Sequence, residues 1–87
     1  MTGSGEGEIT LRYWAAAKDA AGTAEETVPA TSLADALALA RQRHGARFAA
    51  VLDVASLLVD GRRVPPAEDS HLPSGAVVEV LPPFAGG

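Results

Sequence analysis

Cysteine is absent from the 87-residue sequence, and histidine and lysine are scarce. Without a thiol the chain cannot form a disulfide, act as a thiolate nucleophile, or bind zinc or an iron–sulfur cluster through sulfur. Its two histidines and its single lysine, Lys18, are also too few for a metal site built from several histidines. We therefore expect no bound metal, and any sulfur chemistry would use sulfur supplied from outside.

The sequence also lacks an excess of positive charge. Seven Lys and Arg residues against eleven Asp and Glu residues give a formal net charge of −4 and a pI near 4.9. Nucleic acids and anionic lipid surfaces are negatively charged and attract positively charged proteins, so neither is expected as a partner. No apolar run approaches the roughly 20 residues of a membrane span. Glu6 and Glu8 precede the first apolar stretch, which does not fit a secretory signal, so a cytoplasmic location is expected.

Apolar residues make up 47% of the chain and charged residues 21%, which is typical of a globular protein. The length allows a single domain. Residues 1–8 are small, polar and rich in glycine, and we expect them to form a flexible lead. The domain is expected over residues 9–81, with residues 82–87 as a tail.

Hydrophobic patterning predicts the first elements of this domain. Alternating apolar residues predict a strand over residues 9–16, then a turn or helical loop over residues 15–22 and a second strand over residues 23–29. Ser32 is expected to cap a helix, because apolar residues follow it at helical spacing as far as Gly45. Arginine and histidine in the last turn favour the same helix end.

The second half of the chain predicts a short helix and three strands. Helical spacing recurs around residues 48–52, and a hairpin is expected over residues 56–64. Asp60 and Gly61 supply the two positive-φ positions of its type I′ turn. A last apolar strand is expected over residues 76–81. The chain is therefore predicted to be an α+β protein, with a mixed four- to five-stranded sheet and one main helix packed on one face.

The uncovered face of this sheet is predicted to carry an apolar patch. If Tyr13 faces the helix, Trp14 faces away, and the same alternation turns Val77 and Leu81 outward, with Phe84 just beyond. Such patches commonly mark a protein-binding surface. The alternative is a shifted register or a bulge that turns Trp14 inward.

The end of the sequence, Pro-Pro-Phe-Ala-Gly-Gly, is the most informative segment. Two prolines restrict φ and keep the base of the tail extended. Fully extended, six residues reach roughly 20 Å. Gly86 and Gly87 have no side chains, so the terminal carboxylate could pass through a narrow channel into another protein. The alternative is a glycine-rich end without a function.

The sequence resembles the MoaD family, the small subunit of molybdopterin synthase, within the MoaD/ThiS ubiquitin-like sulfur carriers. ITLRYWAAAKDAAG (residues 9–22) resembles the first strand and loop of that family, and SGAVVEVLPPFAGG (residues 74–87) resembles its closing strand and tail. Val59, Asp60 and Gly61 stand where the family has a hairpin. The resemblance covers residues 9–87 and implies a β-grasp, ubiquitin-like fold.

The resemblance also implies a function. Gly87 would be adenylated by an E1-like enzyme that uses ATP, and an external sulfur donor would convert it to a thiocarboxylate. Gly86 would keep the channel passable, and Ala85, Phe84, Pro83 and Pro82 would position the tail. Trp14, Leu81 and Val77 would bind the partner, a MoaE-like large subunit of molybdopterin synthase in molybdenum cofactor biosynthesis. The carrier would have no active site of its own.

Three alternatives remain open at this stage. A sulfur carrier of this kind could serve thiamin, cysteine or thio-sugar synthesis, since the same tail suits each pathway. A ubiquitin-like modifier would join Gly87 to lysines of other proteins. A plain interaction domain would use neither glycine.

Other polar groups are expected to be structural. His44 and His71 have no convergent partner in the sequence that would make a metal site or a general base. The arginines at positions 41, 43 and 47 are expected to form a solvated helix face. Glu25 and Glu26 are neighbours in a strand and point to opposite faces, so they do not suit an acid–base pair.

Overall fold

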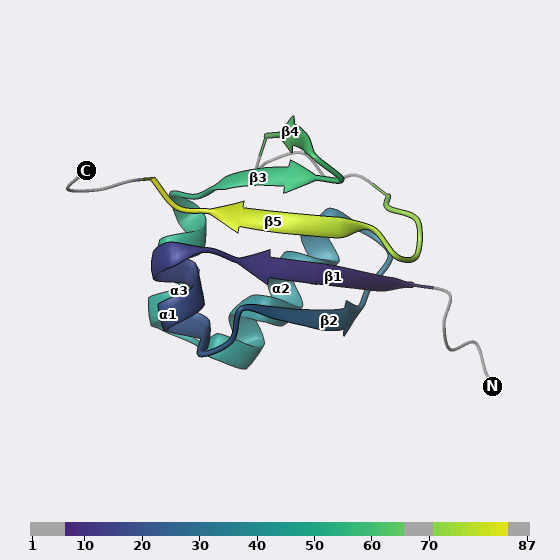
Figure 1. Ribbon diagram of the computed structural model, residues 1–87. Coiled ribbons are helices and arrows are strands. Elements are labelled where there is room, and N and C mark those ends of the chain that lie inside the picture. Colours follow the sequence, from purple (N-terminus) through teal and green to yellow (C-terminus); the bar gives the residue numbers. More distant parts are fainter. Residues whose placement is uncertain (1–6, 66–70, 84–87) are drawn as a thin grey trace.

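The computed structural model describes residues 7–65 and 71–83, which form five strands and three helices (Figure 1). In chain order these elements are β1 (Glu8–Tyr13), α1 (Ala15–Ala21), β2 (Glu25–Pro29), α2 (Leu33–His44), α3 (Ala46–Asp53), β3 (Ser56–Val59), β4 (Arg62–Val64) and β5 (Val77–Leu81). No helix in these two segments is long and apolar enough to cross a membrane.

The strands form one mixed sheet in the order β2-β1-β5-β3-β4. β5, last in the chain, lies in the middle, parallel to β1 and antiparallel to β3. Figure 1 shows the helices together on one side of this sheet, which leaves the other face open. The predicted α+β fold is confirmed, and it has the architecture of a β-grasp domain.

The core lies between the sheet and the helices. Alternate residues of the central strands point into it, and Val78 and Val80 of β5 are completely buried. α2 contributes a stripe of four buried residues at helical spacing: Leu33, Ala36, Leu37 and Ala40. Phe48 of α3 is the largest fully buried side chain in the described part of the chain, and it packs edge-on against Tyr13 at a ring-centroid distance of 5.1 Å.

Two predicted elements have the expected local chemistry. The Ser32 hydroxyl accepts a hydrogen bond from the Asp35 backbone N–H at 3.1 Å, which caps α2. Asp60 and Gly61 have φ values of 48° and 87°, and Val59 pairs with Arg62, so a two-residue turn closes the β3–β4 hairpin.

The first predicted strand, residues 9–16, is too long at its carboxyl end. β1 ends at Tyr13, and α1 begins at Ala15. Ala15 makes the turn between them with a φ of 49°, a left-handed conformation that is uncommon for alanine. Apparent alternation across Trp14, Ala15 and Ala16 misled the prediction, because alanine fits either face of a strand and is also the best helix former. Residues 15–22, predicted as a turn or helical loop, are thus mostly helix.

Two smaller boundary differences accompany this one. β1 begins at Glu8, and the Ala30 N–H donates to the Gly7 carbonyl oxygen at 3.0 Å. The second strand starts at Glu25 rather than at residue 23. Residues 1–6 of the predicted lead lie outside the described residues.

Candidate functional site

The candidate site is built around the point where the tail leaves the sheet. β5 is hydrogen-bonded to a neighbour on each side, and its last residue, Leu81, pairs with Ser56 of β3. Pro82 follows half-buried and Pro83 exposed. The tail therefore starts from the middle strand of the sheet. Four residues predicted to belong to the site lie outside the described residues: Phe84, Ala85, Gly86 and Gly87.

Trp14 lies beside this exit on the open face. Its backbone N–H donates to the Val80 carbonyl oxygen at 3.2 Å, so it continues the β1–β5 pairing past the end of β1. The indole is 45% exposed. Its Nε1–H donates to Glu79 Oε1 at 3.2 Å, and the Arg12 guanidinium carbon lies 5.7 Å from the ring centroid. The outward placement of Trp14 is confirmed, whereas its contact with a partner stays a prediction.

The other two residues of the predicted patch lie at opposite ends of β5. Leu81 and Val77 are both half-buried on the open face, and Glu79 stands between them. They are four residue steps apart along the strand, or about 13 Å. Leu81 is therefore at the tail exit with Trp14, while Val77 lies near the far end of the strand, opposite Thr10.

Leu58 joins this apolar surface, and the sequence interpretation did not include it. It lies on β3 directly opposite Glu79, with Leu57, its neighbour, buried on the helix side. Diagonal neighbours across paired strands lie about 7–8 Å apart, so Leu58 is placed between Val77 and Leu81. The alternation in β3 was the available signal: once Leu57 points inward, Leu58 must point outward.

Charged side chains also cross the open face. Arg12 of β1 forms an ion pair with Glu25 of β2, with Nε 3.7 Å from Oε1. Glu79 of β5 pairs in register with Arg12. On the other side of Leu58, Arg63 of β4 completes the same row across the sheet. The face thus presents apolar side chains at the tail exit and alternating charges beside them.

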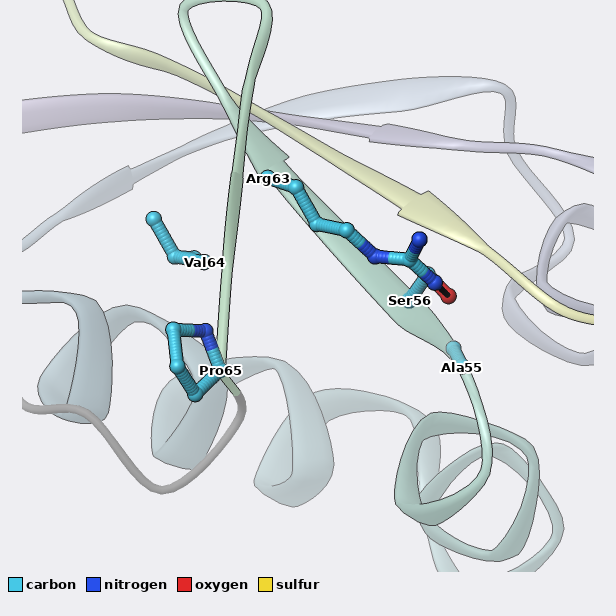
Figure 2. Close-up of a pocket in the computed structure, with 5 residues that line it drawn as sticks. All are labelled: Ala55, Ser56, Arg63, Val64 and Pro65. Atoms are coloured by element: carbon cyan, nitrogen blue, oxygen red, sulfur yellow. Dashed lines mark hydrogen bonds between the residues drawn. The ribbon is translucent and has the colours of Figure 1, made fainter.

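A pocket of about 420 Å³ lies next to the tail exit, where β3 begins and β4 ends (Figure 2). It is lined by Ala55, Ser56, Arg63, Val64 and Pro65. In Figure 2 the Arg63 side chain extends along β3, and its Nη2 donates to the Ser56 hydroxyl at 2.9 Å. Because Ser56 pairs with Leu81, this pocket and the start of the tail are neighbours.

A second polar cluster lies on the helix side of the sheet. Glu26 of β2 accepts from the Tyr13 hydroxyl, approaches His44 Nε2 at 2.5 Å, and accepts from Arg43 at 3.1 Å. Burial opposes ionisation of Glu26, but these hydrogen bonds outweigh it and hold the pKa of Glu26 below its usual value. Burial, and then the bond to Glu26, raise the pKa of Tyr13.

The structure tests the predictions about the two neighbouring glutamates and the two histidines. Glu25 lies on the open face and Glu26 on the helix face, as strand alternation required. His44 packs against the Phe48 ring at a centroid distance of 5.1 Å, with the rings tilted by 56°, and its contact with Glu26 connects the end of α2 to the sheet, which is a structural role. His71 is exposed, and its backbone forms an isolated antiparallel β-bridge with Ser32. In the described segments, His, Asp and Glu form no group of three that could hold a metal ion.

Comparisons with known proteins agree with this fold. The sequence model of the ThiS family matches residues 11–87. SAMP1 from Haloferax volcanii superposes with a TM-score of 0.78 at 22% identity, covering 93% of this chain and 100% of that chain. A Pyrococcus furiosus protein assigned as subunit 1 of a molybdopterin converting factor gives a TM-score of 0.73 at 26% identity, covering 90% and 99%.

The third structure belongs to a complex of subunits 1 and 2 of the molybdopterin-converting factor from Helicobacter pylori. It gives a TM-score of 0.70 at 19% identity and covers 92% of this chain and 99% of that chain. No curated protein sequence matches significantly.

The fold and the family match define the class of protein. This is a ubiquitin-like β-grasp domain of the kind found in MoaD/ThiS-type sulfur carriers and in related modifiers. The chain belongs to the ThiS family. The resemblance to MoaD/ThiS proteins predicted from its two terminal segments is therefore confirmed at the level of the family.

Proposed function

We propose that this protein is a sulfur carrier whose Gly87 carboxylate is adenylated and then converted to a thiocarboxylate. The observation that carries the proposal is the junction between β5 and the tail. The middle strand of the sheet leads directly into Pro82 and Pro83, and the ThiS family match continues to Gly87. A firmly held base with a narrow, side-chain-free end suits delivery of one carboxyl group into the active sites of other proteins.

The chemistry follows from the weakness of a carboxylate as an electrophile. A Gly87 oxygen attacks the α-phosphorus of ATP, pyrophosphate leaves, and an acyl adenylate forms. A persulfide sulfur of the donor then attacks the acyl carbon, and AMP leaves with the electrons of the C–O bond. A second thiol attacks the resulting acyl disulfide, which releases the thiocarboxylate and forms a new disulfide. Since this chain has no cysteine, the persulfide and the thiol both belong to partner proteins.

The acceptor that we propose is the precursor of molybdopterin, with this chain as the small subunit of molybdopterin synthase. The Pro-Pro-x-x-Gly-Gly tail resembles that of MoaD proteins, and the Pyrococcus furiosus relative, 26% identical, is assigned as subunit 1 of a molybdopterin converting factor. The proposed partners are an E1-like adenylating enzyme, a MoaE-like large subunit and an external sulfur donor. Trp14, Leu81 and Val77, with Leu58 between the last two, are proposed as the docking surface.

Intact mass spectrometry tests the carrier function directly. The protein is incubated with ATP, the adenylating enzyme of its own organism and a persulfide donor. We expect one oxygen to be replaced by sulfur, and a chain lacking Gly86 and Gly87 to keep its mass. A variant extended by one residue beyond Gly87 should also fail, because its reactive carboxylate is displaced. Sulfur transfer from the extended variant at the normal rate would refute the role of the tail.

A ubiquitin-like modifier is the second candidate, because SAMP1 has the same fold. Carriers and modifiers share the adenylation step and differ in what attacks the adenylate. A modifier would give ATP-dependent products in which Gly87 is joined to lysines of other proteins. The last tryptic site of this chain follows Arg63, so tryptic peptides carrying residues 64–87 on a lysine would identify these products, whereas a carrier gives the thiocarboxylate alone.

A further inference from the structure

The pocket beside the tail exit contains an arginine that no carboxylate neutralises within residues 7–65 and 71–83. Arg12, Arg41 and Arg43 each form an ion pair with a carboxylate. Among the described residues, Arg63 has only the Ser56 hydroxyl, at 2.9 Å, as a hydrogen-bond partner. A guanidinium has five N–H donors arranged to grip a carboxylate with two parallel bonds. In Arg63 most of these donors have no partner in the described part of the chain.

The walls of the pocket strengthen any charge pairing at this position. Ala55, Val64 and Pro65 are apolar and line the pocket with Ser56 and Arg63, and in Figure 2 the guanidinium end of Arg63 lies beside Ser56. When a second protein covers such a pocket, water is displaced and the effective dielectric constant falls, so an opposite charge is attracted more strongly than on an open surface. The Ser56 hydroxyl fixes the guanidinium in place, which lowers the entropy lost when a carboxylate binds.

The position of the pocket indicates which molecule brings this carboxylate. Ser56 is paired with Leu81, so a protein that receives the tail binds next to the pocket. If the tail enters the enzyme fully extended, Gly87 lies roughly 20 Å beyond Leu81, and the nucleotide that activates it is out of reach of the pocket. The ligand is therefore a group on the surface of the partner protein.

We propose that this pocket binds an aspartate or glutamate side chain of the adenylating enzyme, with an apolar residue of the enzyme against Val64 and Pro65. The inference rests on the proposed function, because it places the pocket beneath the enzyme that activates the tail. Arg63 would then act as a specificity residue. It favours an enzyme with an acidic group at this point and disfavours one with a basic group.

β4 itself supplies a matched control. Arg62 precedes Arg63 and is also exposed, but consecutive strand residues point to opposite faces, and Arg62 pairs with Val59 rather than with Leu58. It does not line the pocket. Arg62→Gln and Arg63→Gln therefore change the net charge equally and differ in whether the proposed contact is lost.

The test is calorimetric titration of the full-length carrier into the adenylating enzyme, at low and at high salt. At low salt we expect Arg63→Gln to weaken binding about tenfold and Arg62→Gln to leave it within about twofold. Arg63→Lys should fall between Arg63→Gln and the wild type, since it keeps the charge but loses the planar fork. High salt should shrink the effect of Arg63→Gln. All three variants should melt at the wild-type temperature, because both arginines are exposed.

Equal binding of Arg63→Gln and wild type would overturn the inference while leaving the carrier function intact, provided that the wild type still gains sulfur in the mass assay. A wild type that neither binds the enzyme nor gains sulfur would overturn both. Inorganic phosphate is the probe for a different ligand. If phosphate alone displaces wild type but not Arg63→Gln from the enzyme, the pocket is a phosphate site and the carboxylate inference is wrong.

Discussion

Trp14→Ala is the perturbation that tests the proposed docking surface most directly. A whole tryptophan side chain can bury about 250 Å². Since 45% of Trp14 is exposed, a partner can cover about 110 Å² more. At about 25 cal/mol per Å² this burial contributes about 2.8 kcal/mol. The expected loss of affinity for the adenylating enzyme is therefore about 100-fold, at 1.4 kcal/mol for each factor of about ten.

The same substitution should leave the fold nearly unchanged. Trp14 caps α1 through its backbone alone, with no hydrogen bond from its side chain to the helix. The indole contacts with Glu79 and Arg12 lie at the surface, and their loss should cost about 1 kcal/mol or less. Urea unfolding followed by circular dichroism measures that change, and calorimetric titration of the enzyme measures the affinity.

Val54 provides the control for Trp14. It is the other large apolar side chain with high exposure among the described residues, at 65%, but it follows α3, in the helix layer. Val54→Ala should bind the enzyme within about twofold of wild type. If Trp14→Ala loses less than about threefold in affinity, or if Val54→Ala loses as much, the open face is not the docking surface. If Trp14→Ala unfolds the domain, the indole belongs to the core and is not part of a docking surface.

Three further predictions concern the scaffold behind this surface. Phe48→Ala should cost about 3–5 kcal/mol in urea unfolding, since the ring is fully buried against Tyr13, and a loss below about 1 kcal/mol would contradict that packing. The pKa of Glu26 is lower in the folded than in the unfolded state, so ionised Glu26 stabilises the fold fully above its unfolded pKa, and this stabilisation is lost as the pH falls through its folded pKa. Glu26→Gln should therefore flatten the acid side of a plot of unfolding free energy against pH. An unchanged slope would exclude this role. Asp60→Ala should destabilise the hairpin more than Asp60→Asn, because Asp60 has a positive φ, which asparagine tolerates better than alanine. The Asp60 side chain also accepts a hydrogen bond from the Val77 N–H at 3.0 Å, which an asparagine oxygen can retain. Equal melting temperatures of the two variants would refute this account.

Elements whose signals are local in the sequence were predictable. Ser32 and Gly45 bracket α2 because a hydroxyl cap and a glycine each satisfy backbone groups within a few residues. The Asp60-Gly61 turn determined the β3–β4 register for the same reason. The β1–α1 junction was not predictable in this way. Ala15 turns the chain with a positive φ that alanine rarely adopts, and only the surrounding packing selects it.

The site itself was predictable only where it is continuous in the sequence. Leu81 follows from alternation within β5, and Trp14 from the alternation of β1 continued by one residue past its end. The positions of Leu58 and Arg63 beside the tail exit depend on the order of strands in the sheet, since Leu58 lies opposite Glu79 only because β3 pairs with β5. Pairing between strands far apart in the chain leaves no local trace, so the pocket lined by Arg63 could not be found from composition or periodicity.

If the tail works as proposed, the sheet order suits its presentation to different enzymes. Leu81 lies on the middle strand, with Trp14 on the β1 side and the Arg63 pocket on the β3–β4 side. A partner that takes up the tail meets an aromatic surface on one side and a cation on the other. The aromatic surface suits any apolar partner, whereas the cation suits only partners with an acidic group at that position. If the large subunit that receives the sulfur lacks this group, Arg63→Gln should weaken binding to the adenylating enzyme and leave binding to the large subunit unchanged.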